Sequence, residues 1–286
     1  MDQGAHGLSS IIHKTSRLPD DAAATMTARK EVPMRLSLSG ILLMLGMLFG
    51  CYPKGDPNKP IPTAFVPAPR LAQRLVIVLP GRGDGLDGLQ RAAIAQAIQS
   101  QWPDADVTLS GLAIGYYLQG NAIRRLHDEI VAPARTRGYR EIWLLGASLG
   151  GLGALMYDGQ WPGTVDGIVL MAPYLGEKPL LDEIAAAGGI ARWNPGPVPP
   201  AVNGDNFQHE LWRHLQGWSR DPSRARNVWL AYGDQDYLRE TMPSLTPLLP
   251  PSHVLVRHGK HAWSVWTPAT RDILARIDAE RRQRSP

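Results

Sequence analysis

The fold of this 286-residue chain is decided by one stretch, Ile142-Trp143-Leu144-Leu145-Gly146-Ala147-Ser148-Leu149-Gly150. Its first four residues are all apolar, which is typical of a parallel strand buried on both faces. A helical pattern to about Tyr157 follows the glycines. Ser148 therefore lies on a tight strand-to-helix turn, where the crowded backbone admits only small residues two positions before and after the serine. Glycine occupies both positions, so the sequence predicts an exposed Ser148 hydroxyl beside the N–H of Leu149 at a helix N-terminus.

Strands and helices alternate on both sides of this turn. Such alternation predicts an α/β fold, with a mostly parallel sheet covered by helices on both faces. Residues 176–226 interrupt it, because they are rich in Gly, Pro and Trp, and we expect a lid insertion of about this extent. The other expected strands are 75–79, 106–114, 167–171, 228–232 and 253–257, and the other expected helices are 87–101, 121–137 and 267–282.

A serine hydroxyl is a weak nucleophile at neutral pH, so it needs a base, and the base needs an acid to orient it. Two of the later strands end in suitable segments, Gly233-Asp234-Gln235-Asp236 and His258-Gly259-Lys260-His261-Ala262-Trp263. Together with the turn at Ser148, these segments resemble the α/β-hydrolase superfamily, specifically its serine esterases and lipases, over about residues 73–282. The sequence therefore points to one superfamily through three separate segments.

The resemblance assigns roles within these segments. The acid of the superfamily commonly lies three residues after a glycine, which implies Asp236, with Asp234 as the alternative. Its base commonly lies in a Gly-x-His pattern, often with a Trp two residues later, which implies His261, with His258 as the alternative. A Ser148, His261 and Asp236 triad would then be positioned for acyl transfer.

The same resemblance implies a second backbone donor for the oxyanion, in the loop after the first strand. That loop reads Leu79-Pro80-Gly81-Arg82-Gly83-Asp84, with Pro80 where many relatives carry His. The N–H of Arg82, or otherwise that of Gly81, would join the N–H of Leu149 in binding the oxyanion.

The implied reaction is cleavage of carboxylic esters, from small molecules or lipids, through an acyl-enzyme and without a metal or organic cofactor. A thioesterase or acyltransferase could use the same triad, and a membrane-tethered binding protein could retain the scaffold without catalysis. Aromatic residues around the insertion either form an apolar pocket for the substrate or pack the lid. They are Trp193, Trp212 and Trp218, with Tyr174 after the fourth strand.

Two other patterns favour different chemistry but fail in detail. Residues 83–88 have the spacing of a dinucleotide-binding loop, yet two carboxylates within the loop would repel a pyrophosphate. His209 and His214 resemble a zinc-binding helix, but a spacing of five places them about 140° apart on the helix, so they cannot share one metal comfortably. The balance of 30 Lys and Arg against 26 Asp and Glu gives a net charge of +4, too small to imply a nucleic-acid partner.

Residues 1–50 are expected to be an N-terminal extension and signal peptide. The run 36–50 is uncharged over 15 residues, which suits a signal-peptide core and is short for a membrane span of about 20. The segment Leu48-Phe49-Gly50-Cys51 resembles a bacterial lipobox, although Phe49 is bulkier than usual. The resemblance implies that Cys51, the only cysteine, is lipidated and becomes the mature N-terminus. It also implies a lipid anchor in the membrane of a bacterial cell envelope, and Met34 is then a plausible start.

Residues 51–70 complete this picture as a tether. Six prolines lie between positions 52 and 70, which favours extended chain at about 3.1 Å per residue and a reach of roughly 60 Å. The alternative is a loop wrapped on the domain surface. We expect the α/β domain itself to span residues 71–286.

Overall fold

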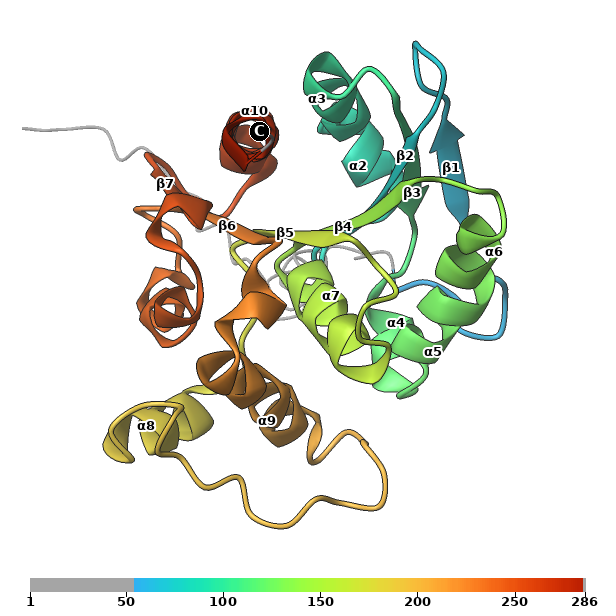
Figure 1. The fold of residues 1–286 in the computed structure, drawn as a ribbon. Coiled ribbons are helices and arrows are strands. Elements are labelled where there is room, and N and C mark those ends of the chain that lie inside the picture. Colours follow the sequence, from blue (N-terminus) through green and yellow to red (C-terminus); the bar gives the residue numbers. More distant parts are fainter. Residues whose placement is uncertain (1–53, 285–286) are drawn as a thin grey trace, which may run out of the picture. The chain divides into compact units, whose positions relative to one another are not determined.

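The computed structural model describes residues 54–284. One seven-stranded sheet has the order β1-β3-β2-β4-β5-β6-β7, and every neighbouring pair is parallel except β1 and β3 (Figure 1). The prediction of a mostly parallel α/β sheet is thus confirmed. The strands are β1 (Thr63–Val66), β2 (Arg74–Leu79), β3 (Ala105–Ser110), β4 (Glu141–Ala147), β5 (Gly167–Met171), β6 (Val228–Gly233) and β7 (Val254–Arg257).

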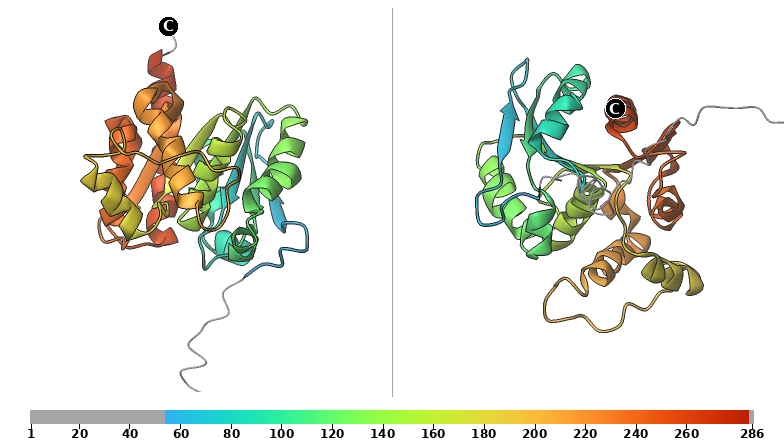
Figure 2. Two further views of the ribbon diagram at one scale, coloured as in Figure 1. Left: turned by 90° about the horizontal axis from the view of Figure 1, so that it is seen from below. Right: turned by 180° about the vertical axis from the view of Figure 1, so that it is seen from behind.

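Helices cover both faces of the sheet, and two hydrophobic cores result (Figures 1 and 2). Successive side chains of a strand point to opposite faces, so Ile77 joins one core and Val76 and Val78 join the other. One face is covered by α2 (Leu86–Arg91), α3 (Ile94–Gln101) and α10 (Trp263–Arg284). The other is covered by α4 (Ile114–Leu118), α5 (Ala122–Leu126), α6 (Ala132–Arg135) and α7 (Leu149–Gln160), with α8 (Lys178–Ala186) and α9 (Phe207–Arg220) farther out.

Three expected elements are interrupted. The helix expected over 87–101 breaks at Ala93, whose φ of 52° is left-handed and separates α2 from α3. The helix expected over 121–137 contains a π-helical turn, His127–Val131, between α5 and α6. The strand expected over 106–114 ends at Ser110, and the chain then turns into α4, with the Ala113 N–H donating to the Gly111 carbonyl at 2.7 Å.

The expected tether over 51–70 is wrong for the residues from Lys54 onward. Thr63–Val66 forms β1, which pairs antiparallel with β3, and Ile61 is buried. The Lys54 carbonyl accepts the Gly115 N–H at 2.7 Å, so even the start of the segment is bound to α4. Prolines favour extended backbone, which is the conformation of an edge strand as well as of a free tether. The folded domain therefore includes Lys54 instead of beginning at residue 71, while residues 51–53 lie outside the described part.

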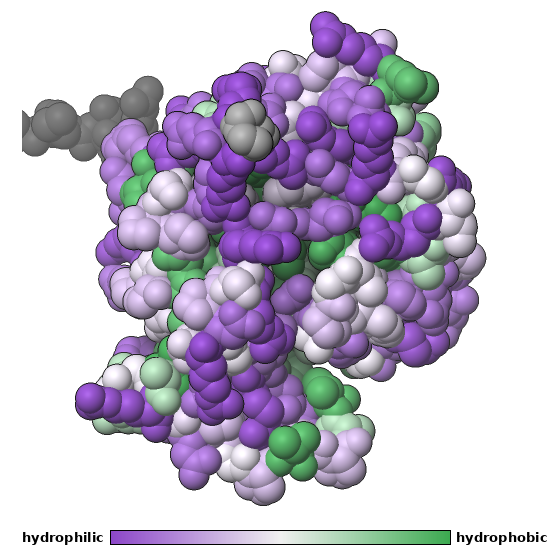
Figure 3. Space-filling view, in the orientation of Figure 1, coloured by the Kyte–Doolittle hydropathy of each residue, from purple (hydrophilic) through white to green (hydrophobic). Residues whose placement is uncertain are grey.

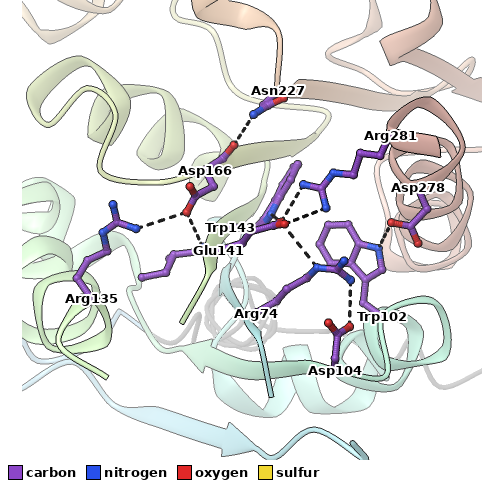
Figure 4. A network of polar contacts seen from close by, with 11 residues as sticks. Arg74, Trp102, Asp104, Arg135, Glu141, Trp143, Asp166, Asn227, Asp278 and Arg281 are labelled. Atoms are coloured by element: carbon purple, nitrogen blue, oxygen red, sulfur yellow. Dashed lines mark hydrogen bonds and ion pairs between the residues drawn. The ribbon is translucent and has the colours of Figure 1, made fainter. Parts of the chain in front are cut away.

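A polar network ties together the amino ends of the parallel strands (Figure 4). Glu141, at the start of β4, accepts two hydrogen bonds from Arg281 at 3.1 and 2.8 Å and lies 3.7 Å from Arg74. Burial alone would raise the pKa of Glu141, but the hydrogen bonds from Arg281 and Trp143 outweigh it and hold this pKa below its usual value. The network therefore holds together the amino ends of the strands, whereas Ser148 lies at their carboxyl ends.

The insertion after β5 carries α8, α9 and a short 3₁₀ turn, Pro222–Ala225. Its three tryptophans are almost fully buried: Trp212 donates to the Leu175 carbonyl at 2.7 Å, and Trp193 donates to Glu183 at 2.7 Å. Trp193 and Trp212 therefore pack the insertion, and Trp218 is buried in the wall of a cavity beside α8. Among residues 54–284, no helix is both long enough and apolar enough to cross a membrane.

Candidate active site

Ser148 lies on a strained turn between β4 and α7. Its φ and ψ are 52° and −113°, a conformation that non-glycine residues rarely adopt. The turn is held by backbone hydrogen bonds, because the Ser148 N–H donates to the Met171 carbonyl at 2.9 Å and the Tyr174 N–H donates to the Ser148 carbonyl at 3.0 Å. Strain that the surroundings maintain in this way is characteristic of functional positions.

The glycines on either side of Ser148 are required by close backbone contacts. A Cβ on Gly146 would overlap the Gly150 carbonyl, and a Cβ on Gly150 would overlap the Leu79 carbonyl. The small residues expected two positions before and after the serine are thus needed for steric reasons. The second contact also brings the end of β2 against the first turn of α7.

The loop after β2 lies beside Ser148. A Cβ placed on Gly81 would be 3.5 Å from the Ser148 Cβ, so Gly81 and Arg82 border the serine. Arg82 and Leu149 both line the cavity that contains Ser148. Leu149 is the first residue of α7, and a helix supplies no acceptor for the N–H groups of its first turn. Both backbone segments expected to bind an oxyanion therefore meet at the serine.

Asp236 and His261 form a buried pair. Asp236 follows β6 and is fully buried, and its two carboxylate oxygens lie 2.9 and 2.8 Å from Nδ1 of His261. The Leu238 N–H donates to the same carboxylate at 2.8 Å, which leaves this buried charge well satisfied. The His261 ring also packs edge-on against Trp266 at 4.6 Å. These contacts fix the ring and engage Nδ1, so Nε2 is the nitrogen left for proton transfer.

The two alternative residues form a second pair in the same loops. Nδ1 of His258 lies 3.1 Å from Asp234, with side chains that are 80% and 48% exposed. A hydrogen bond from the Gly259 N–H, followed by the one from His258, holds the pKa of Asp234 below its usual value. Of these two pairs, the one formed by Asp236 and His261 is shielded from water.

The histidine loop is bonded to the loop beside Ser148 through a contact that sequence reasoning missed. The indole N–H of Trp263 donates to the Asp84 carboxylate at 2.8 Å, across 179 positions of sequence. Asp84 in turn caps its own loop, since its N–H donates to the Gly81 carbonyl at 3.1 Å. The Gly-x-His pattern with a Trp two residues later places Trp263 near His261. Nothing in the sequence indicates that Trp263 contacts Asp84.

A cavity of about 580 Å³ opens beside Ser148, and we call it the serine cavity. Leu149, Leu152, Met156 and Gln160 of α7 line one wall, so the wall extends roughly 16 Å at 1.5 Å per residue. Most of the remaining lining is apolar, and the loop between α8 and α9, part of which forms a hydrophobic area on the surface, contributes the exposed Val202 (Figure 3). Its other lining residues include Ile114, Leu118, Ile123, Tyr174, Val202, Phe207 and Tyr237.

Among the aromatic residues expected at the substrate, Tyr174 alone lines this cavity. Its hydroxyl donates to Glu177 at 2.5 Å, and burial together with that hydrogen bond raises the pKa of Tyr174, so the phenol stays neutral. The two histidines of the zinc-like pattern have separate acidic partners. Nε2 of His214 lies 2.8 Å from Asp158, and Nε2 of His209 lies 3.9 Å from Glu183.

The arrangement of the strands and helices is found in solved enzymes. Est1E from Butyrivibrio proteoclasticus is 14% identical, with a TM-score of 0.51 over 76% of this chain and 95% of that one. A ferulic acid esterase is 13% identical, with a TM-score of 0.50 over 75% of this chain and 95% of that one. This chain has the α/β-hydrolase fold. At such identities the likeness establishes the α/β-hydrolase fold alone, and no family model and no curated protein matches the chain.

Proposed function

We propose that this α/β-hydrolase is a serine hydrolase that cleaves carboxylic esters. The observation that carries the proposal is the buried Asp236 carboxylate bonded to Nδ1 of His261, in the loops after β6 and β7. These loops lie at the carboxyl edge of the parallel strands, the edge at which β4 delivers Ser148 on its strained turn. The esterases among the solved structures of this fold add support.

The Asp236 carboxylate accepts a hydrogen bond from Nδ1–H of His261 and thereby keeps Nε2 unprotonated as the base. Ser148 Oγ attacks the ester carbonyl carbon while its proton passes to Nε2. The N–H groups of Leu149 and Arg82 bind the oxyanion, at the positive end of α7. The carbon–oxygen bond to the alcohol then breaks, and the Nε2 proton leaves with the alcohol. Water repeats the sequence on the acyl-enzyme, so one ester and one water give one acid and one alcohol.

The first test is covalent labelling of the purified protein with a fluorophosphonate, together with hydrolysis of 4-nitrophenyl butyrate. We expect stoichiometric labelling and turnover, both lost in Ser148→Ala. Thr267→Ser, a conservative change on α10 at a residue that donates to the Ala92 carbonyl, is the matched control and should keep both. Folded protein that neither labels nor hydrolyses any ester would overturn the assignment and leave a binding protein on a hydrolase scaffold.

We further propose that a lipid on Cys51 anchors the domain to a bacterial envelope membrane. The supporting observations are the uncharged run over 36–50 and the lipobox-like residues that end it. Since Lys54 is already bound to α4, the link from Cys51 is three residues and at most about 11 Å long. An anchor at Cys51 would therefore keep the domain close to the membrane.

The short link would also place the membrane near the serine cavity. The Lys54 carbonyl accepts the N–H of Gly115, and Leu118, on the same helix, is 79% exposed and lines the cavity. Cys51→Ser should release the enzyme from membranes and leave its turnover of a soluble ester unchanged. Unmodified and uncleaved Cys51 in the native membrane fraction, found by mass spectrometry, would refute the anchor.

A further inference from the structure

A second and larger cavity lies on the other side of Tyr237. Its volume is about 1160 Å³, and its walls are α8 on one side and residues 240–250 on the other, so we call it the α8 cavity. Ser148 does not line it. Among residues 54–284, Tyr237 is the one that lines both this cavity and the serine cavity.

Tyr237 connects the α8 cavity to the proposed proton donor. It directly follows Asp236 in sequence, its side chain is exposed, and its ring centre lies 4.4 Å from that of His261. His261 itself lines neither cavity, but its neighbour Tyr237 lines both. Both cavities are therefore bordered by the residue whose ring lies beside the proposed acid–base histidine.

The proposed chemistry determines where the acyl half and the alcohol half of the ester must lie. The acyl half is bonded to Ser148 in the intermediate, so it occupies the cavity that Ser148 lines. The alcohol half takes its proton from Nε2 of His261, so its oxygen must lie at that ring. We propose that the α8 cavity binds the alcohol half of the substrate and that Tyr237 divides the two subsites. This inference rests on the proposed function.

The lining defines the class of alcohol. The floor is apolar, with Leu181, Ile184 and Leu248 buried there. The charged lining residues are paired, because Lys178 lies 2.6 Å from Asp182 and Glu240 lies 3.0 Å from Arg239. A neutral rim over an apolar floor favours a bulky, uncharged alcohol and disfavours a polyanionic leaving group such as coenzyme A. The substrate class is therefore an ester with a leaving group larger than its acyl group.

The test compares leaving groups at a constant acyl group. Methyl butyrate, the 6-O-butyrate of octyl glucoside and butyryl-coenzyme A carry a small, a bulky uncharged and a polyanionic leaving group, respectively. Ala185→Trp places a large side chain in the α8 cavity, away from Ser148. Ala186→Trp is the matched control, because Ala186 is the next residue of the same helix, is also exposed and lines neither cavity.

In the wild type, kcat/KM should be highest for the octyl glucoside ester. Ala185→Trp should lower this value about tenfold or more, mainly through KM, and leave methyl butyrate within about twofold. Ala186→Trp should leave both unchanged. Ala185→Leu, which retains a good helix former, should give a smaller loss of the same kind and guards against misfolding of the tryptophan variant.

Two failures are distinguishable in this experiment. If the wild type labels with fluorophosphonate and hydrolyses methyl butyrate, but Ala185→Trp and Ala185→Leu leave the ratio between the two esters unchanged, the α8 cavity is not the alcohol subsite. A preference for butyryl-coenzyme A would also overturn the inference, since the rim would then have to accept polyanions. If the wild type hydrolyses none of the three and does not label, the proposed function itself fails.

Discussion

The loops after β6 and β7 carry two Asp–His pairs that differ mainly in their surroundings. His261 bonds to Asp236 at 2.8 Å, and His258 bonds to Asp234 at 3.1 Å. Asp236 is fully buried and the His261 side chain is 13% exposed, whereas Asp234 and His258 are 48% and 80% exposed. The residue types and the geometry are thus nearly the same in both pairs, and the contrast is in access to water.

The difference teaches that burial, more than pairing, separates a proposed catalytic dyad from a surface contact. Water screens the exposed pair, so its attraction is weak and either partner can turn away. The buried carboxylate has no water to replace its partners, so it holds His261 in one tautomer and one orientation. The five predictions that follow test this contrast, from the largest expected effect to the smallest.

Replacement of the histidines should separate the pairs most sharply. His261→Ala removes the proposed base, and we expect kcat for 4-nitrophenyl butyrate to fall on the order of 10⁶-fold, as in other triads. His258→Ala should leave kcat within about twofold, since that ring is exposed to solvent. Steady-state kinetics on both variants decides the matter. The reverse pattern would assign the base to His258 and break the comparison.

Replacement of the acids should give the next largest contrast. Asp236→Asn keeps the shape of the side chain but lets its amide donate to Nδ1, which favours the wrong tautomer of His261. We expect kcat to fall about 10⁴-fold. Asp234→Asn is the matched control and should change kcat less than about twofold. Equal losses in the two variants would show that the dyad cannot be chosen by burial.

A substitution between the two loops should disturb both pairs at once. A Cβ on Gly233 would overlap the Gly259 carbonyl, so Gly233→Ala must push the loops apart. A misplacement of about 1 Å costs on the order of 10²-fold in rate, and we expect kcat to fall by that amount. The thermal midpoint should fall too, because backbone atoms cannot yield cheaply. Gly204→Ala, where a Cβ would meet nothing within 4 Å, is the control for stability.

The sequence predicted the site best where a catalytic residue type lies in a segment whose backbone geometry restricts its neighbours. Gly146, Ser148 and Gly150 identify the turn because the close approach of the backbone allows little else at the glycine positions. The loops that carry Asp236 and His261 could also be named, since acid and base follow strands of the same sheet. The resemblance favoured Asp236, but Asp234 stayed open as the alternative, because two acids in one loop differ in burial, which the sequence does not show.

Other features depend on partners that are distant in sequence. The segment Thr63–Val66 lies among prolines that suit a tether, and only its pairing with β3 makes it a strand. Tyr237 has no local signal, since its importance comes from its contact with His261 and from the two cavities that it borders. Long-range packing of this kind leaves no periodicity for a single sequence to reveal.

The link between Trp263 and Asp84 should matter less than the dyad. Trp263→Phe removes the indole N–H and leaves most of the ring, so one hydrogen bond between the histidine loop and the Gly81 loop is lost. A hydrogen bond worth about 1 kcal/mol corresponds to a loss of about fivefold in kcat/KM. We expect the loss in kcat, with KM nearly unchanged, because the contact positions catalytic groups and does not bind substrate. A change confined to KM would instead place Trp263 in the substrate site.

The smallest effect concerns the exposed pair and acid stability. The Gly259 N–H and His258 hold the pKa of Asp234 below its usual value, so the ionised carboxylate stabilises the fold at neutral pH. That contribution is present above about pH 4, the usual pKa of the unfolded residue, and is lost as the pH falls through the lower folded value. Asp234→Asn should therefore have a slightly lower urea midpoint than the wild type at pH 7, and the difference between the two midpoints should shrink as the pH falls below about 4. If the wild-type midpoint instead rises relative to that of Asp234→Asn towards acid pH, the ionised Asp234 carboxylate destabilises the fold. The exposed pair would then not be a stabilising contact.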